Sequence, residues 1–300
     1  MNAVEYCLLN GLKVAGPDHP ALLCASETLS YGALAARVAQ FAEGLRASGV
    51  KPGDRVGMLM LDTPDIVALH QAAMATGAIA VAMSSRATQD ELKHILAVVH
   101  PAVIVVDREF AELASGGIAA ASPETKLLYR DHELAEWKAK PAGVLKPVVR
   151  QPDDPAFWVM TSGTTGVPKA VAIEHRAIAN LVAADLDEFG LTSDARVGQN
   201  SSLAYDSSVE ELWLALAAGA TVVVIDDAAA RLGPDLVPLL RDERLGDRRL
   251  MHRYDLYRHG DRERRRAGRR HHRSGRDDHR PRNDRAAADG CAVRPAPDQI

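Results

Sequence analysis

The sequence predicts an α/β fold of stacked, mostly parallel sheets with flanking helices. Segments with apolar residues at helical spacing alternate with short apolar runs between residues 20 and 245. The runs are rich in Val, Ile and Ala on both faces, which is typical of strands buried in parallel sheets. With 300 residues and 47% hydrophobic content, the chain can also form a sizeable core.

The first six elements follow one another with short turns between them. Gly49 stands at a C-cap position, Thr63 and Pro64 form an N-cap and N1 pair, and Thr88 and Glu91 have the spacing of a capping box. In order, the pattern predicts a helix over 31–49, a strand over 55–61, a helix over 63–77, a strand over 78–84, a helix over 88–100 and a strand over 102–107.

A looser stretch over 108–150 separates these elements from a second alternation, which contains a loop at 161–171. The pattern there predicts a strand over 156–160, a helix over 175–190, a strand over 196–202, a helix over 208–219, a strand over 221–226 and a helix over 234–244. The order again indicates a doubly wound body with two sheet layers.

Charge divides the chain at residue 245. Residues 1–245 carry 20 basic and 31 acidic side chains, whereas residues 246–300 carry 16 Arg, no Lys and 9 acids. The second segment lacks apolar periodicity, so we expect it to be disordered. The predicted domains are therefore a body over 1–245 and an Arg-rich tail over 246–300.

Two interpretations of the tail are open. A basic arm that binds nucleic acid is one, but such arms usually mix Lys with Arg and contain fewer Asp. The other is out-of-frame translation, which we favour. Codons for Gly246 to Arg249, read one base later, permit a Val- and Thr-rich strand that continues the alternation. An uninterrupted reading frame near codon 245 would contradict this interpretation.

Composition favours a cytoplasmic location. The chain opens without a basic and apolar leader, and no apolar run reaches the eighteen or so residues of a membrane span. Cys7, Cys24 and Cys291 are widely spaced, so the sequence predicts neither a disulfide framework nor a zinc site. We expect no membrane association and no metal bound by protein ligands alone.

The loop "TSGTTGVPKAV" at 161–171 has the residue types of a phosphate cradle. Gly163 and Gly166 let backbone N–H groups turn inward, and Lys169 adds a positive charge. Hydroxyl donors come from Thr161, Ser162, Thr164 and Thr165. The spacing fits neither G-x-x-x-x-G-K-[ST] nor G-x-G-x-x-G. The loop thus predicts a polyphosphate site of another kind.

This loop resembles the phosphate-loop signature of the adenylate-forming (AMP-binding) superfamily, which includes acyl-CoA synthetases and the adenylation domains of nonribosomal peptide synthetases. The resemblance extends over about residues 20–245, the N-terminal part of that fold, and departs from the family at Ala170, where Gly is usual. It implies ATP and Mg²⁺ as cofactors and an acyl-adenylate as product. It also implies that residues 161–166 and Lys169 bind the β and γ phosphates, with Lys169 as the candidate catalytic residue.

The segment "SLAYDSSVEELW" at 202–213 resembles the "FDxSxxE" motif of amino-acid-activating members. Tyr205 matches the aromatic residue, and Asp206 matches the residue that pairs with the α-ammonium group of the amino acid. Asp206 also fits an N-cap. Ser207 and Glu210 match side-chain pocket positions, and a carboxylate there favours a cationic substrate such as ornithine or lysine.

The resemblance implies an amino-acid adenylation domain, closest to those of nonribosomal peptide synthetases, that partners a phosphopantetheinyl carrier protein in an intact parent. The family's later motifs are not readable after residue 245, so we expect the chain to be incomplete and inactive alone. An acyl- or aryl-CoA ligase of the same superfamily is the first alternative. Nucleic-acid binding through the tail is the second.

Overall fold

The computed structural model describes residues 1–161 and 168–225. They fall within one compact unit, Met1–His252. The helix predicted over 234–244 and the tail over 246–300 lie outside the described residues, so the division at residue 245 stays a prediction. Within the described ranges, no helix has the length and apolar character needed to cross a membrane.

Two β-sheets form the framework of the described residues. The larger has the strand order β6-β5-β3-β4-β7-β8 and the smaller β2-β1-β10-β9. Neighbouring strands are parallel except in the pairs β7–β8 and β1–β2. The strands are β1 (Pro20–Leu23), β2 (Thr28–Ser30), β3 (Arg55–Leu59), β4 (Ile79–Ala82), β5 (Val103–Val106), β6 (Lys126–Tyr129), β7 (Pro155–Thr161), β8 (Lys169–Glu174), β9 (Arg196–Gln199) and β10 (Thr221–Val224).

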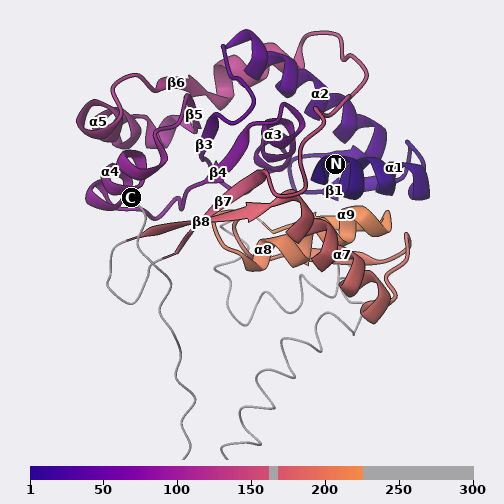
Figure 1. The fold of residues 1–300 in the computed structure, drawn as a ribbon. Helices are drawn as coiled ribbons and strands as arrows, with labels where there is room; N and C mark the ends of the chain where they lie inside the picture. Colours follow the sequence, from indigo (N-terminus) through magenta and orange to yellow (C-terminus); the bar gives the residue numbers. More distant parts are fainter. Residues whose placement is uncertain (162–167, 226–300) are drawn as a thin grey trace, which may run out of the picture. The chain divides into compact units, whose positions relative to one another are not determined.

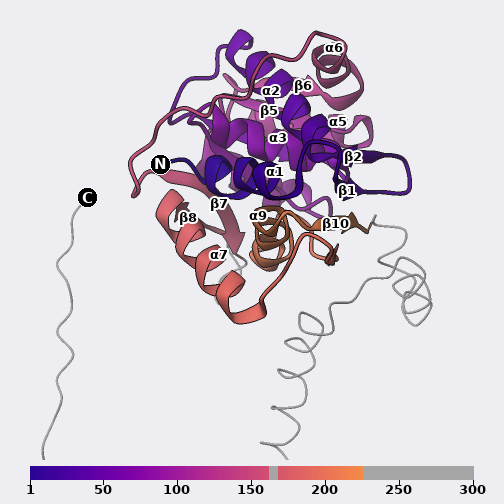
Figure 2. The same ribbon diagram turned by 90° about the vertical axis from the view of Figure 1, so that its right-hand side faces the viewer.

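Helices cover both faces of the larger sheet. Figure 1 shows α2 and α3 on one side of β3, β4 and β5, and α4 and α5 on the other. Figure 2 shows α9 beside α1. The helices are α1 (Asn10–Ala15), α2 (Tyr31–Ala47), α3 (Pro64–Ala75), α4 (Gln89–Val99), α5 (Ala111–Ala121), α6 (Ala135–Lys138), α7 (His175–Phe189), α8 (Ser207–Val209) and α9 (Ala215–Ala218), with short π or 3-10 segments η1 (Glu5–Leu9), η2 (Arg108–Phe110), η3 (Arg130–Leu134) and η4 (Glu210–Leu214). The predicted fold class, mostly parallel sheets with flanking helices, is confirmed.

The two faces of the larger sheet bury different cores. Side chains alternate between faces along a strand, and in β5 Val103 and Val105 join the core that contains α2 and α3. Ile104 and Val106 join a smaller core with α4 and α5. The strands are therefore apolar on both faces, as the sequence pattern predicts.

Helix α3 is buried along its whole length. Every residue from Pro64 to Ala75 is buried, and Asp65 is compensated by ion pairs with Arg37 (3.1 Å) and Lys138 (2.7 Å). A buried carboxylate without such partners would cost several kcal/mol. Because protein interiors are close-packed, this fully buried helix sets the separation between the elements that pack against it.

The first alternation is confirmed element by element, and the capping box of α4 is present. Glu91 N donates to Thr88 Oγ1 (3.3 Å), and Thr88 N donates to Glu91 Oε2 (2.8 Å). The elements before residue 31 (η1, α1, β1 and β2), those within the looser stretch (η2, α5, β6, η3 and α6) and β8 were not predicted. The loop at 161–171 was expected to lead from a strand to a helix, and instead it joins two antiparallel strands.

Two buried histidines are held neutral by the fold. His70 packs against the Phe157 ring, and burial lowers the pKa of His70 to about 3. His175 Nδ1 accepts a hydrogen bond from Ala3 N (3.1 Å), which requires an unprotonated Nδ1. Burial, and to a smaller extent the positive Arg150 guanidinium, lowers the pKa of His175 to about 4.

Stability should therefore fall as the pH drops from about 7 towards 5. A histidine whose pKa is lower in the folded chain than the unfolded value of about 6.5 stabilises the fold above that value and loses the contribution as pH falls. We expect each of the two to contribute about 1–2 kcal/mol to the loss between pH 7.5 and pH 5. Urea unfolding at both pH values measures it.

The variant His175→Asn keeps an acceptor near the Nδ1 position and removes the titration, so the pH-dependent loss should shrink by about half. His132→Asn, at an exposed side chain in η3, is the matched control and should leave the loss unchanged. An unaltered pH dependence in His175→Asn would contradict the neutral-histidine interpretation.

Candidate functional site

The two ends of the predicted phosphate loop are paired neighbours in the larger sheet. Strand β7 is parallel to β4 on one side and antiparallel to β8 on the other. In the antiparallel register Thr161 is the partner of Lys169, and both side chains are exposed. Ser162, Gly163, Thr164, Thr165 and Gly166 lie outside the described residues. The structure therefore places the first and last predicted phosphate contacts side by side.

The substrate motif forms one continuous turn and helix after β9. Tyr205 N donates to Ser202 O (2.9 Å) in the turn, and α8 begins at Ser207 and runs directly into η4 and α9. Tyr205 and Asp206 are exposed, whereas Ser207 and Glu210 are half-buried. All four predicted substrate residues thus lie within two helical turns of one another along the chain.

Asp206 occupies the N-cap of α8, as one of its two predicted roles requires. Its Oδ1 accepts from Ser207 N (2.9 Å). A carboxylate has two oxygens and about four acceptor positions, so this contact leaves capacity for a second donor. The capping role and an ammonium-binding role are compatible at the same side chain.

Glu211, one residue past Glu210, anchors the motif. Its buried carboxylate accepts from Asn200 N (3.0 Å), Ser201 N (2.9 Å) and Ser201 Oγ (3.2 Å). Burial, and to a lesser extent the nearby Asp62 carboxylate, raises the pKa of Glu211 against the opposing effect of these hydrogen bonds. The contacts fix the carboxyl end of β9 against η4, and so fix both ends of the turn that carries Tyr205. Glu211 stands at the final Glu of the "FDxSxxE" pattern, and it was not predicted as a site residue.

A cluster of three rings joins the two halves of the site. Phe157 on β7 stacks on Trp213 of η4 with ring centroids 6.3 Å apart and planes inclined by 12°. His70 of α3 contacts both rings, at 5.4 Å and 5.8 Å. The strand that leads to Thr161 is thereby packed on the helix that follows Asp206. Sequence patterns predicted neither this contact nor the pairing of Thr161 with Lys169.

The arrangement offers charges of both signs at strand ends. Lys169 provides an exposed ammonium group where the predicted loop returns to the sheet, and Asp206 provides an exposed carboxylate beyond β9. Exposed ammonium groups suit phosphate oxygens, and carboxylates suit ammonium groups. Within residues 1–161 and 168–225, no group of three or more His, Cys, Asp or Glu side chains could hold a metal ion.

Comparison with protein families gives a match to the AMP-binding enzyme model over residues 13–245. The chain is 32% identical over 232 residues to phosphinothricin tripeptide synthetase PhsC of Streptomyces viridochromogenes, covering 76% of the chain and 20% of that protein. It is 30% identical over 233 residues to 3-hydroxybenzoate–CoA/4-hydroxybenzoate–CoA ligase of Thauera aromatica, covering 75% of the chain and 45% of the ligase. The chain therefore spans less than half the length of these relatives.

Two solved structures, of a nonribosomal peptide synthetase and of MatB, are also similar to this chain. The AMPPNP-bound form of the nonribosomal peptide synthetase FmoA3 superposes with a TM-score of 0.70 at 28% identity, over 81% of this chain and 25% of that one. ATP-bound MatB from Rhodopseudomonas palustris superposes with a TM-score of 0.68 at 23% identity, over 80% and 48%. The second likeness concerns the fold alone.

Removing the Glu211 carboxylate should loosen the substrate motif. Glu211→Ala leaves three donors without their acceptor, and we expect a loss of about 2–3 kcal/mol in the free energy of unfolding. Glu211→Gln keeps one acceptor oxygen and should lose less. Glu188→Ala, at an exposed position of α7, is the control. Chemical denaturation measures all three, and a Glu211→Ala variant as stable as the control would contradict the anchoring role.

Proposed function

The chain belongs to the AMP-binding enzyme family, and from this premise we propose that it carries the ATP- and carboxylate-binding parts of an AMP-forming ligase. The proposed reaction joins a substrate carboxylate to the α phosphorus of ATP, giving an acyl-adenylate and pyrophosphate. The observation that carries the proposal is the antiparallel pairing of Thr161 with Lys169, which holds the ends of the hydroxyl- and glycine-rich loop together. Residues 161–166 and Lys169 are the proposed phosphate contacts.

The chemistry of this reaction asks for positioning and charge neutralisation rather than a covalent catalyst. Phosphoryl-type transition states carry charge spread over oxygens, and preorganised donors stabilise that charge. Lys169 is proposed to neutralise the departing pyrophosphate. Mg²⁺, when bound with ATP, would neutralise further charge on the phosphates.

We propose an amino acid as the substrate. Asp206 is exposed beyond a strand end and keeps acceptor capacity after capping α8, which supports a contact with an α-ammonium group. The peptide synthetase relatives favour the same class, and in a longer protein the aminoacyl group would pass to a phosphopantetheinyl carrier protein. Glu210, in a half-buried position three residues beyond Ser207, favours a cationic side chain such as that of ornithine or lysine.

The second candidate is an aryl- or acyl-CoA ligase, because hydroxybenzoate–CoA ligases match the chain almost as well as peptide synthetases do. The two candidates differ at Asp206. An exposed carboxylate beside the substrate carboxyl group would repel a substrate that lacks an ammonium group. Removing the negative charge of Asp206 therefore distinguishes the two substrate classes.

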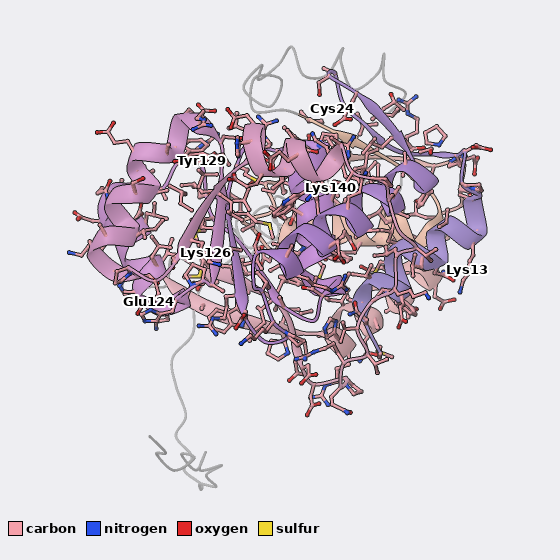
Figure 3. The ribbon with its side chains drawn as sticks, turned by 90° about the horizontal axis from the view of Figure 1, so that it is seen from above. Lys13, Cys24, Glu124, Lys126, Tyr129 and Lys140 are labelled. Atoms are coloured by element: carbon pink, nitrogen blue, oxygen red, sulfur yellow. The ribbon has the colours of Figure 1, made fainter. Side chains whose placement is uncertain are left out.

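Binding of ATP by the chain itself tests the phosphate site. Lys169→Met should weaken ATP binding about tenfold to hundredfold, since a charge-assisted contact to phosphate is lost. Lys13→Met, at an exposed lysine of α1 labelled in Figure 3, is the matched control and should bind ATP like the unaltered chain. Calorimetry measures the affinities. Equal affinities for the unaltered chain and Lys169→Met would overturn the assignment of Lys169.

Pyrophosphate exchange tests the substrate class. A panel of amino acids that includes ornithine and lysine, together with 3- and 4-hydroxybenzoate, is offered to the chain extended by the remainder of an AMP-binding enzyme. We expect exchange with amino acids, highest for basic ones, and about a hundredfold lower exchange in Asp206→Asn.

Exchange that depends on hydroxybenzoate and persists in Asp206→Asn would favour the CoA-ligase candidate instead. A panel without preference for basic amino acids, or with the same preference in Glu210→Gln, would remove the role proposed for Glu210.

A further inference from the structure

The exit of the phosphate loop is bound to a helix from a distant part of the chain. Pro168, the residue before Lys169, has its carbonyl oxygen 3.1 Å from Nε2 of His94 on α4. A carbonyl oxygen can only accept, so His94 Nε2–H is the donor. Both the neutral Nε2–H tautomer and the imidazolium satisfy this contact.

The donor, His94 Nε2, is carried by helix α4, whose position is fixed by its packing. Leu92, Ile95 and Leu96 of α4 are buried in the smaller core, and the capping box at Thr88 closes the start of the helix. His94 projects from the same helix to the sheet edge, where α4 lies against β8. The position of Nε2 is thus set by packing that does not involve the loop.

The acceptor, Pro168 O, lies just before a strand at the edge of the larger sheet. Among the described strands, β8 pairs only with β7 and is the edge of the larger sheet. Its first residue, Lys169, is exposed and reaches solvent through four flexible methylene groups. The proline ring of Pro168 fixes its φ near −65°. Holding its carbonyl oxygen therefore restrains the backbone one residue before Lys169.

We propose that His94 is a positioning residue: by binding Pro168 O it fixes the start of β8, and so directs the Lys169 ammonium group towards the polyphosphate. The proposal rests on the phosphate-binding role proposed for Lys169. It assigns His94 no contact with the nucleotide. A binding side chain whose backbone is already restrained loses less conformational freedom when the ligand binds. This is the general basis of preorganisation.

A double-mutant cycle on ATP affinity separates positioning from general support. His94→Ala should weaken ATP binding about threefold to tenfold, because the freedom that the start of β8 gains must then be lost when ATP binds. In the Lys169→Met background the same change should have no further effect, because the group that it positions is absent. An equal loss in both backgrounds, or no loss in the first, would overturn the proposal.

Two further variants make the result specific. The amide nitrogen of glutamine can take the place of Nε2–H, so His94→Gln should recover ATP affinity to within about twofold of the unaltered chain. Lys93→Ala, an exposed neighbour on α4, is the matched control and should change nothing. Failure of His94→Gln to recover affinity while it folds normally would count against the hydrogen bond as the cause.

Trypsin cleavage after Lys169 gives a readout that needs no nucleotide. Loss of the tether should raise the rate of cleavage between Lys169 and Ala170 at least about threefold in His94→Ala but not in Lys93→Ala. If the unaltered chain binds no ATP, the proposed function falls and the positioning role falls with it. The cleavage rates then still decide whether the tether exists, and equal rates in His94→Ala and the unaltered chain would show that it does not.

Discussion

The antiparallel register between β7 and β8 is the constraint on which the candidate site depends. It makes Thr161 the partner of Lys169 and so closes the loop between them at its base. The register is not set by the loop, because Phe157 and Val159 of β7 are buried in the larger core while Trp158 and Met160 pack against the smaller one. A slip of one residue would exchange these two sets. Burial of the β7 side chains in the two cores therefore stabilises the register that brings Thr161 and Lys169 together.

The same strand connects the proposed phosphate side of the candidate site to its proposed substrate side. Phe157 stacks on Trp213, and His70 of the fully buried helix α3 packs against both rings. Such ring pairs contribute about 0.5–1.5 kcal/mol beyond the burial of their area. Among the described residues, Nδ1 of His70 and Nε1 of Trp213 have no hydrogen-bond partner. Each unsatisfied group costs about 1–3 kcal/mol, which the burial of two large rings offsets.

Sequence patterns predicted the elements whose stability is local, and missed those that depend on distant partners. Helix α4 has a capping box and a clear apolar stripe, so its bounds follow from its own residues. Helix α5 contains Gly116 and Gly117, which lower helix propensity. A Cβ at Gly117 would lie 2.9 Å from Leu96 Cδ1, so α4 approaches α5 closely at this glycine, and no local pattern reveals that approach. Strand β8 is a strand because β7 pairs with it.

The candidate site likewise contains residues that the sequence predicted and residues whose roles it did not predict. Thr161, Lys169 and Asp206 were predicted from residue types and resemblance, and the structure shows where the chain brings them. Glu211 was visible as the last residue of the motif, but its anchoring role required knowledge of where Asn200 and Ser201 lie. His94 carries no sequence signal at all. Its contact joins residues 74 positions apart.

Asp206 caps α8, and the same position suits the proposed chemistry. Its negative charge at the start of α8 is stabilised by the helix N-terminus and by the hydrogen bond from Ser207 N. A carboxylate held in this way has a fixed orientation, and an ammonium group that approaches it does not have to order it first. The structural role therefore does not compete with the proposed binding role. Capping would lower the entropic cost of the proposed binding.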